Sequence, residues 1–152
     1  MSKCKVLIVD DIAENIAQVV DMLSNLDIEI KKAYGGKEAI ELVETYKPNI
    51  VLLDLMMPEV NCWDVIQHIR AKYDKNEMII IITSLLNNKD NIDECYEMGV
   101  NDYVTKPIIP ARIRSSVESH MKNIRNEENV PRAEHHQLKK AQPASLIEMD
   151  PA

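Results

Sequence analysis

Phenylalanine is absent from this sequence of 152 residues, and aromatic residues make up only 4% of it. The hydrophobic core must therefore be aliphatic, with methionines filling gaps between branched side chains. Long apolar runs are missing as well. The longest, such as Met78–Ile82, have four or five residues, whereas a membrane span needs about 20. We therefore expect no association with a membrane.

Positive charge is also scarce, since the net charge is −7. This balance argues against a chain that binds nucleic acid or membrane surfaces in a general way. The three cysteines, Cys4, Cys62 and Cys95, are scattered and lack metal-type spacing. Only four apolar residues separate Met1–Lys5 from two acids, so we expect no secretory signal. We predict a cytoplasmic protein with reduced thiols.

Short apolar runs do occur, and they alternate with segments of helical periodicity. They predict strands at Lys5–Val9, Glu29–Ala33, Ile50–Leu53, Met78–Ile82 and Asp102–Thr105. Apolar residues at helical spacing predict helices over 12–26, 39–46, 63–73, 92–96 and from near Pro110 to 124, with Gly99 just beyond the fourth. This alternation implies a parallel sheet with helices on both faces.

The composition changes near residue 126. The last residues contain three prolines, many charges and few apolar side chains. We expect one domain over residues 1–126, followed by a polar linker or tail over residues 127–152 that lacks a core of its own.

Polar residues stand where predicted strands stop: Asp10 and Asp11, Asp54, Thr83, and Lys106. In a parallel sheet these positions share the carboxyl edge, where ligands bind. If the first and third strands are neighbours, three carboxylates converge and repel one another unless a cation is present. Mg²⁺ suits such a site. A lysine and a hydroxyl would then complement a phosphoryl group on Asp54.

Four motifs in this order carry a resemblance to a known family. They are Asp10-Asp11 after KVLIV, Asp54 in LLDLMMP, Thr83 after IIII, and Lys106-Pro107 in GVNDYVTKP. From about Lys5 to Asn126 the chain resembles the receiver domain of a bacterial two-component response regulator. The resemblance implies an α/β flavodoxin-like receiver fold, a doubly wound five-stranded parallel sheet of order 2-1-3-4-5 with five helices.

The resemblance also implies a role for each matching acid. Asp54 would be the phosphoacceptor, taking a phosphoryl group from a phosphohistidine to form an acyl phosphate. Asp11 and Asp54 would bind Mg²⁺ directly and Asp10 through water. The backbone carbonyl of Met56 would complete the protein ligands.

Three further residues would respond to the phosphoryl group. Lys106 would pair with its oxygens, Thr83 would move to hydrogen-bond it, and Tyr103 would swing inward as part of the switch. In this family the bond before Pro107 is often cis. The chain would then be a phosphoprotein of phosphorelay signal transduction, catalysing only its own phosphorylation and dephosphorylation.

The sequence departs from the family pattern at several positions. Cys62 stands where glycine is usual, which raises the question of whether φ is negative there. Ser84 stands where alanine is common. Met56 and Leu85 flank the predicted pocket at positions that are often polar. Because apolar residues there give water little help in attacking an acyl phosphate, we predict slow self-dephosphorylation.

Two other function classes compete with this interpretation. A degenerate receiver would only bind proteins, but it would usually have lost the acceptor, the acid pair or the lysine. An Mg²⁺-dependent phosphatase of the haloacid-dehalogenase type would want a second Asp where Met56 stands. Glycine-rich dinucleotide and phosphate-loop motifs do not occur.

The expected partner is a sensor histidine kinase or a histidine phosphotransfer protein. Charges on the fourth helix, the fifth strand and the fifth helix would suit a homodimer, but we favour a solvated face. These charges are Asp90, Asp93, Glu94, Arg112 and Arg114. Asn15, in the first turn of its helix, could approach the phosphate, but we favour exposure to solvent. We expect His120 to be packed or half-buried on the last helix.

Overall fold

The computed structural model of the protein describes residues 3–57 and 62–128, with side chains described as far as residue 124. The chain falls into two units, Met1–His120 and Met121–Ala152. Pro58 and the predicted tail beyond Glu128 lie outside the described residues. The division into a domain over 1–126 and a tail therefore stays a prediction.

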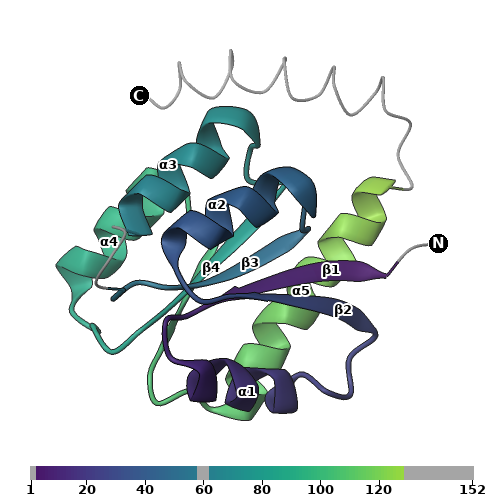
Figure 1. Cartoon of the computed structure of the whole chain (residues 1–152), viewed down its shortest axis with the longest axis horizontal. Coiled ribbons are helices and arrows are strands. Elements are labelled where there is room, and N and C mark those ends of the chain that lie inside the picture. Colours follow the sequence, from purple (N-terminus) through teal and green to yellow (C-terminus); the bar gives the residue numbers. More distant parts are fainter. Residues whose placement is uncertain (1–2, 58–61, 129–152) are drawn as a thin grey trace. The chain divides into compact units, whose positions relative to one another are not determined.

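Five parallel strands form one sheet in the order β2-β1-β3-β4-β5 (Figure 1). They are β1 (Cys4–Val9), β2 (Ile28–Ala33), β3 (Ile50–Asp54), β4 (Ile79–Ser84) and β5 (Asp102–Thr105). The predicted doubly wound parallel sheet is confirmed, including its order. Two strands run further than expected at their carboxyl ends, because Asp54 pairs in register with Thr83 as part of the ladder.

Five helices connect the strands, and their bounds are α1 (Ala13–Met22), α2 (Gly36–Thr45), α3 (Cys62–Lys72), α4 (Lys89–Met98) and α5 (Pro110–Glu128). The first helix ends four residues before the predicted Leu26. At the end of this helix the Leu23 N–H donates to the carbonyls of Val19 and Val20, and the Leu26 N–H donates to the Leu23 carbonyl. Leu23 directly follows the helix and is buried in this closing turn. The apolar pattern of the sequence therefore extends beyond the end of the helix.

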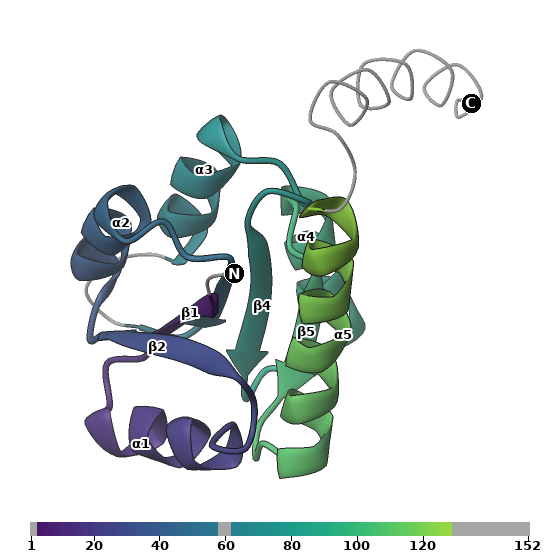
Figure 2. The same cartoon turned by 90° about the vertical axis from the view of Figure 1, so that its right-hand side faces the viewer.

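Buried side chains of the central strands alternate between the two faces of the sheet. Figures 1 and 2 show α2, α3 and α4 on one face and α1 on the other, together with the first part of α5. The core under α2 to α4 includes Leu7, Val9, Val51, Leu53, Ile80 and Ile82. The intervening residues Ile8, Leu52 and Ile81 are also buried and face the α1 side. This two-sided burial explains the unbroken apolar runs.

The amino ends of β4 and β5 are held by one side chain, that of Arg70 on α3. Its Nε donates to the Gly99 carbonyl at 2.7 Å and its Nη1 to the Met78 carbonyl at 2.8 Å. Its Nη2 donates to Asn101 Oδ1 at 2.9 Å. Gly99 has a left-handed backbone, φ 107°, directly after α4, as predicted for a residue that ends a helix.

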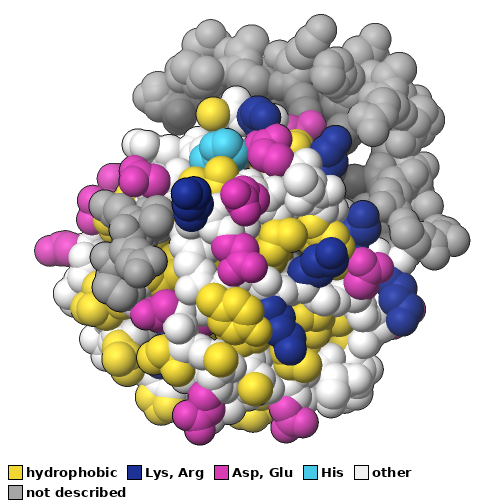
Figure 3. All heavy atoms as spheres, viewed as in Figure 1, with side chains coloured by type: hydrophobic (Ala, Val, Ile, Leu, Met, Phe, Trp, Pro, Cys, Tyr) yellow, Lys and Arg dark blue, Asp and Glu magenta, His cyan; other side chains and the backbone are white. Residues whose placement is uncertain are grey.

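Within the part of the chain that the structure describes, no helix combines the length and the apolar character needed to cross a membrane. On the face viewed in Figure 1, acidic and basic side chains are interspersed (Figure 3). This pattern agrees with a sequence that has no excess of positive charge.

Candidate functional site

The carboxyl edge of the sheet collects the polar residues predicted for the site. Asp10 follows β1 directly, Asp54 ends β3, Thr83 lies in β4, and Lys106 follows β5. Because β1 pairs with β3, β3 with β4, and β4 with β5, the ends of neighbouring strands are adjacent. The topology therefore brings together residues that are far apart in the sequence.

Three carboxylates form an acidic cluster at this edge, made of Asp10, Asp11 and Asp54. One carboxylate oxygen from each lies within 4.8 Å of the others. Asp10 and Asp54 are each only 5% exposed, whereas Asp11 is exposed. An all-oxygen donor set with one open side fits a hard divalent cation that keeps several waters.

Lys106 stands between the two buried acids. Its Nζ lies 3.2 Å from Asp10 Oδ2 and 3.5 Å from Asp54 Oδ1. The Lys106 N–H also donates to the Ser84 carbonyl at 2.7 Å, which anchors the residue beside β4. The bond between Lys106 and Pro107 is cis. One ammonium group thus balances at most one of the negative charges near it.

The environment of Asp54 disfavours the ionised form of its carboxyl group. Burial is the main cause of a raised pKa for Asp54, and the charge of Asp10 adds to it. Lys106 and the Met56 N–H, which donates to Asp54 Oδ1 at 3.2 Å, act in the opposite direction. The net rise means that the ionised carboxylate gains from an additional positive charge.

The carboxylate of Asp10 is held by hydrogen bonds from residues close to it in the sequence. Its Oδ1 accepts from the Ile12 N–H at 2.9 Å, and the Asn15 amide donates to its Oδ2 at 3.3 Å. The expectation of a solvent-exposed Asn15 was wrong, since the residue is half-buried against Asp10. Its place in the first turn of α1, soon after Asp10, was the available signal for this contact.

The loop after β4 connects the acceptor edge to Tyr103. Thr83 is 6% exposed beside Asp54, and the buried Ser84 hydroxyl accepts from the Leu86 N–H at 3.0 Å. The Tyr103 hydroxyl donates to the Leu86 carbonyl at 2.6 Å, and its ring is buried. Tyr103 therefore occupies an inward position that ties β5 to this loop.

The departures from the family pattern have clear structural settings. Among the described residues Lys47 is the one non-glycine with positive φ, so Cys62 needs no glycine-like backbone. Burial raises the pKa of the Cys62 thiol to about 12, which keeps it protonated at neutral pH. Met56 and Leu85 are 54% and 68% exposed, and each follows two residues after a residue of the acceptor edge, Asp54 and Thr83.

Three of the charges considered for a dimer, those of Asp93, Arg112 and Arg114, have contacts within the chain. Arg112 Nη2 lies 3.1 Å from Asp102 Oδ1, Arg114 donates to the Met22 carbonyl at 3.4 Å, and Lys89 pairs with Asp93 at 3.0 Å. The two ion pairs reduce the charge available for a dimer, which stays a prediction. His120 is half-buried, as expected, with Nδ1 2.8 Å from the Ser116 carbonyl.

Comparisons with known proteins agree with this geometry. A family model described as the response regulator receiver domain matches residues 6–118. The chain is 36% identical over 110 residues to the chemotaxis protein CheY of Thermotoga maritima, covering 72% of this chain and 90% of that protein. It is 34% identical over 128 residues to a Vibrio cholerae protein named as a probable cyclic di-GMP phosphodiesterase, covering 84% of this chain and 29% of that protein.

Among solved structures, the receiver domain of the Francisella response regulator 1452 is similar. Its TM-score is 0.70 at 28% identity, and the match covers 78% of this chain and 96% of that one. The chain spans only 29%, 50% and 52% of three of the curated relatives that it matches. What those longer proteins do as wholes therefore does not transfer to this chain by similarity alone.

Proposed function

The chain belongs to the response regulator receiver domain family of two-component systems, and we propose that it takes a phosphoryl group from a phosphohistidine onto Asp54. The observation that carries this proposal is the placing of Lys106 Nζ 3.2 Å from Asp10 and 3.5 Å from Asp54 inside a cluster of three carboxylates. A buried acid next to a cation and two further acids suits the reception of an anionic phosphoryl group through a metal ion.

Mg²⁺ is the cofactor that we propose for this cluster. Asp11 and Asp54 would bind the ion directly, Asp10 through water, and the Met56 carbonyl would add a backbone ligand. The raised pKa of Asp54 supports this assignment, because burial and the Asp10 charge favour a further cation. When bound, the ion would neutralise the acids and the incoming phosphoryl oxygens.

The transfer needs little from the protein beyond position and charge. An Asp54 carboxylate oxygen attacks phosphorus, and an acyl phosphate forms as the bond from phosphorus to the imidazole nitrogen breaks. The electron pair of that bond stays on the imidazole nitrogen. Lys106 leaves its contact with Asp54 Oδ1 to pair with the phosphoryl oxygens. Attack of water on the acyl phosphate later restores the Asp54 carboxylate and releases phosphate.

The signal would leave through the loop after β4. Thr83 lies beside Asp54 in the register of β3 and β4 and would hydrogen-bond the phosphoryl group. Movement of Thr83 would reach Leu86, whose carbonyl accepts from the Tyr103 hydroxyl at 2.6 Å. Tyr103 would then report the phosphorylated state to the face made by α4, β5 and α5.

The partners follow from this chemistry. A sensor histidine kinase or a histidine phosphotransfer protein would supply the phosphoryl group in the cytoplasm. The receiver itself would be no enzyme beyond its own phosphorylation and dephosphorylation. A chain of this kind would pass its state to an output domain or a partner protein, with residues 127–152 as a linker or tail.

Incubation with Mg²⁺ and acetyl phosphate tests the proposal. We expect one acid-stable, base-labile phosphoryl group, detected by intact mass, that is lost in Asp54→Asn and retained in Asp64→Asn. Asp64 is the matched control, because it is an exposed aspartate on α3. Chelation of the metal should also prevent labelling. Repeated turnover of acetyl phosphate would indicate a phosphatase, and an unmodified protein would indicate a receiver that only binds partners.

A further inference from the structure

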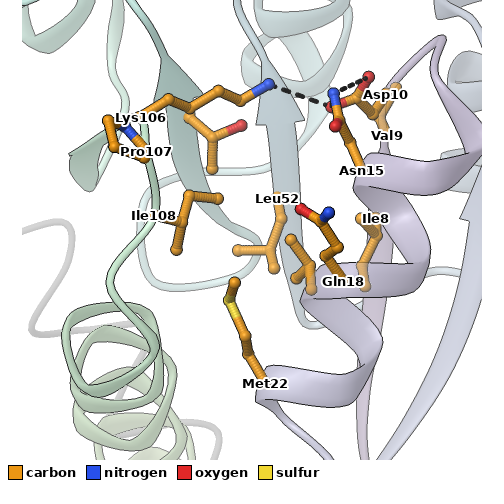
Figure 4. A pocket seen from close by; sticks show the side chains of 12 residues that line it. Ile8, Val9, Asp10, Asn15, Gln18, Met22, Leu52, Lys106, Pro107 and Ile108 are labelled. Carbon is orange, nitrogen blue, oxygen red and sulfur yellow. Dashed lines mark hydrogen bonds and ion pairs between the residues drawn. The ribbon is translucent and has the colours of Figure 1, made fainter.

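A cavity of about 280 Å³ lies beside the acidic cluster, between α1 and the segment Lys106–Ile108. Figure 4 shows Asn15, Gln18 and Met22 of α1 on one side and Ile108 on the other, with Leu52 of β3 between them. All the lining residues belong to the unit Met1–His120. The cavity opens to solvent, and its volume is just below the range of about 300–1,000 Å³ that is usual for small-molecule sites.

The phosphoryl transfer proposed above uses only one end of this cavity. Asp10, Thr83 and Lys106 are shared with the acceptor edge. Most of the remaining lining is aliphatic, and Ile8, Val19 and Leu52 there are each less than a tenth exposed. An anionic phosphoryl group gains nothing from such a surface. The apolar part of the cavity has no use in the reaction.

Two amides give the entrance a polar character. Asn15 donates to Asp10, and Gln18, one turn along α1, is exposed at the opening. Asp10 and Lys106 offset each other's charge at 3.2 Å. A mostly apolar pocket with a few convergent polar groups is the usual form of a small-molecule site. This balance favours a neutral ligand with one hydrogen-bonding group over an ion.

We propose that the cavity binds a small, neutral, mostly apolar molecule, and that its occupancy is coupled to cation binding at the acidic cluster. An engineered apolar cavity of about 150 Å³ binds benzene. At about 280 Å³ this cavity fits a fused bicyclic molecule of roughly nine to twelve non-hydrogen atoms. The single polar group of the ligand would face Asn15 and Gln18.

Coupling follows from the shared wall. A cation that draws the Asp10 carboxylate toward itself changes the contact between Asp10 and Lys106, and both residues line the cavity. A ligand that fixes this wall must change cation affinity by the factor by which the cation changes ligand affinity. The binding part of the inference does not depend on the proposed function. The coupling part depends only on metal binding by the acidic cluster.

Indole is a suitable probe, since it is neutral and bicyclic and has one N–H. We expect a dissociation constant at or below about 1 mM, with methyl NMR shifts centred on Ile8, Met22 and Ile108. Met22→Trp should fill the cavity with its own ring and weaken binding at least tenfold. Val19→Phe is a second filling variant. Asp21→Trp, at an exposed neighbouring position outside the lining, should bind like the unmodified protein.

Saturable binding that both filling variants weaken, with Asp21→Trp unaffected, would support the inference. Equal affinity in the folded filling variants, or shifts centred elsewhere, would overturn the site. Addition of Mg²⁺ should change the indole dissociation constant at least twofold. An unchanged constant in a protein that visibly binds Mg²⁺ would overturn the coupling. A protein that binds indole but no Mg²⁺ would contradict the proposed metal site and the coupling, and would leave the cavity assignment standing.

Discussion

Replacement of Arg70 tests whether one side chain holds the amino ends of β4 and β5. The guanidinium of Arg70 reaches four backbone carbonyls, those of Gly99, Met78, Tyr73 and Asp74. It also reaches Asn101 Oδ1, which in turn accepts from the Ile80 N–H at 2.9 Å. The contact therefore joins α3, the end of α4 and the starts of two strands.

The expected loss of unfolding free energy follows from the number of hydrogen bonds that the guanidinium can donate. Nη1 contacts three carbonyls with two hydrogens, so we count four effective hydrogen bonds in all. At about 1 kcal/mol net for each bond, they contribute about 4 kcal/mol. Burial opposes this gain and lowers the pKa of Arg70 to about 10. We therefore expect Arg70→Met to lower the free energy of unfolding by about 3 kcal/mol.

Gly99 provides a second, independent measure of the same contact. A Cβ there would lie 3.1 Å from Arg70 Nε and 3.2 Å from its Cδ, and φ is +107°. Gly99→Ala should cost about 1–2 kcal/mol for the left-handed backbone, with an added cost from the crowded arginine. In an Arg70→Ala background the crowding disappears and the backbone cost remains. Gly99→Ala should therefore be less destabilising there.

Urea unfolding followed by the fluorescence of Trp63, the single tryptophan, measures these free energies. Arg114→Met is the matched control, since Arg114 makes one long contact at 3.4 Å with the Met22 carbonyl. It should cost less than about 1 kcal/mol. A loss below about 1 kcal/mol for Arg70→Met, or additive costs for Arg70→Ala and Gly99→Ala within about 0.5 kcal/mol, would refute the reasoning.

Three further predictions concern the acceptor edge and the switch. Because the folded-state pKa of Asp54 is raised, its ionisation lowers stability as pH rises above about 4. Asp54→Asn should therefore be more stable than the unmodified protein at pH 7 and equally stable near pH 3; a lower melting temperature at pH 7 would contradict this. The phosphorylated protein should persist for minutes or longer, and Met56→Asn should shorten its lifetime, as followed by intact mass; decay within seconds that Met56→Asn does not accelerate would contradict a protective role of the apolar residues Met56 and Leu85. Tyr103→Phe removes the hydrogen bond to the Leu86 carbonyl and should cost about 1 kcal/mol in urea unfolding; no change would mean that water replaces the hydroxyl.

Helix and strand ends were the least predictable features of the fold. Asp54 and Thr83 look in the sequence like residues beyond their strands, but each belongs to the ladder because the other stands opposite it. Leu26 continues the apolar spacing of α1, yet it lies in the closing turn beyond the helix. The ends of β3 and β4 depend on a partner strand that is distant in the sequence. The end of α1 depends on hydrogen bonds in the turn that follows it, which the helical pattern does not predict.

Local patterning by itself predicted a parallel sheet and the edge that carries the site, whereas the strand order came from the family resemblance. A strand buried on both faces is apolar along its length, so the polar residue that follows an apolar run marks the carboxyl end of that strand. This physical rule predicts that Asp10, Asp54, Thr83 and Lys106 lie at one edge of the sheet. The motifs at those positions then identified the family of the chain.

Only the tertiary structure decided how these residues meet. The contact of Lys106 with Asp10 joins positions 96 residues apart in the sequence. The sequence pattern predicted neither the hydrogen bonds of Arg70 nor the cavity lined by Met22 and Ile108. Periodicity reports which face of an element is apolar. The contacts made by a given side chain, and the volume left unfilled, depend on how several elements pack at once.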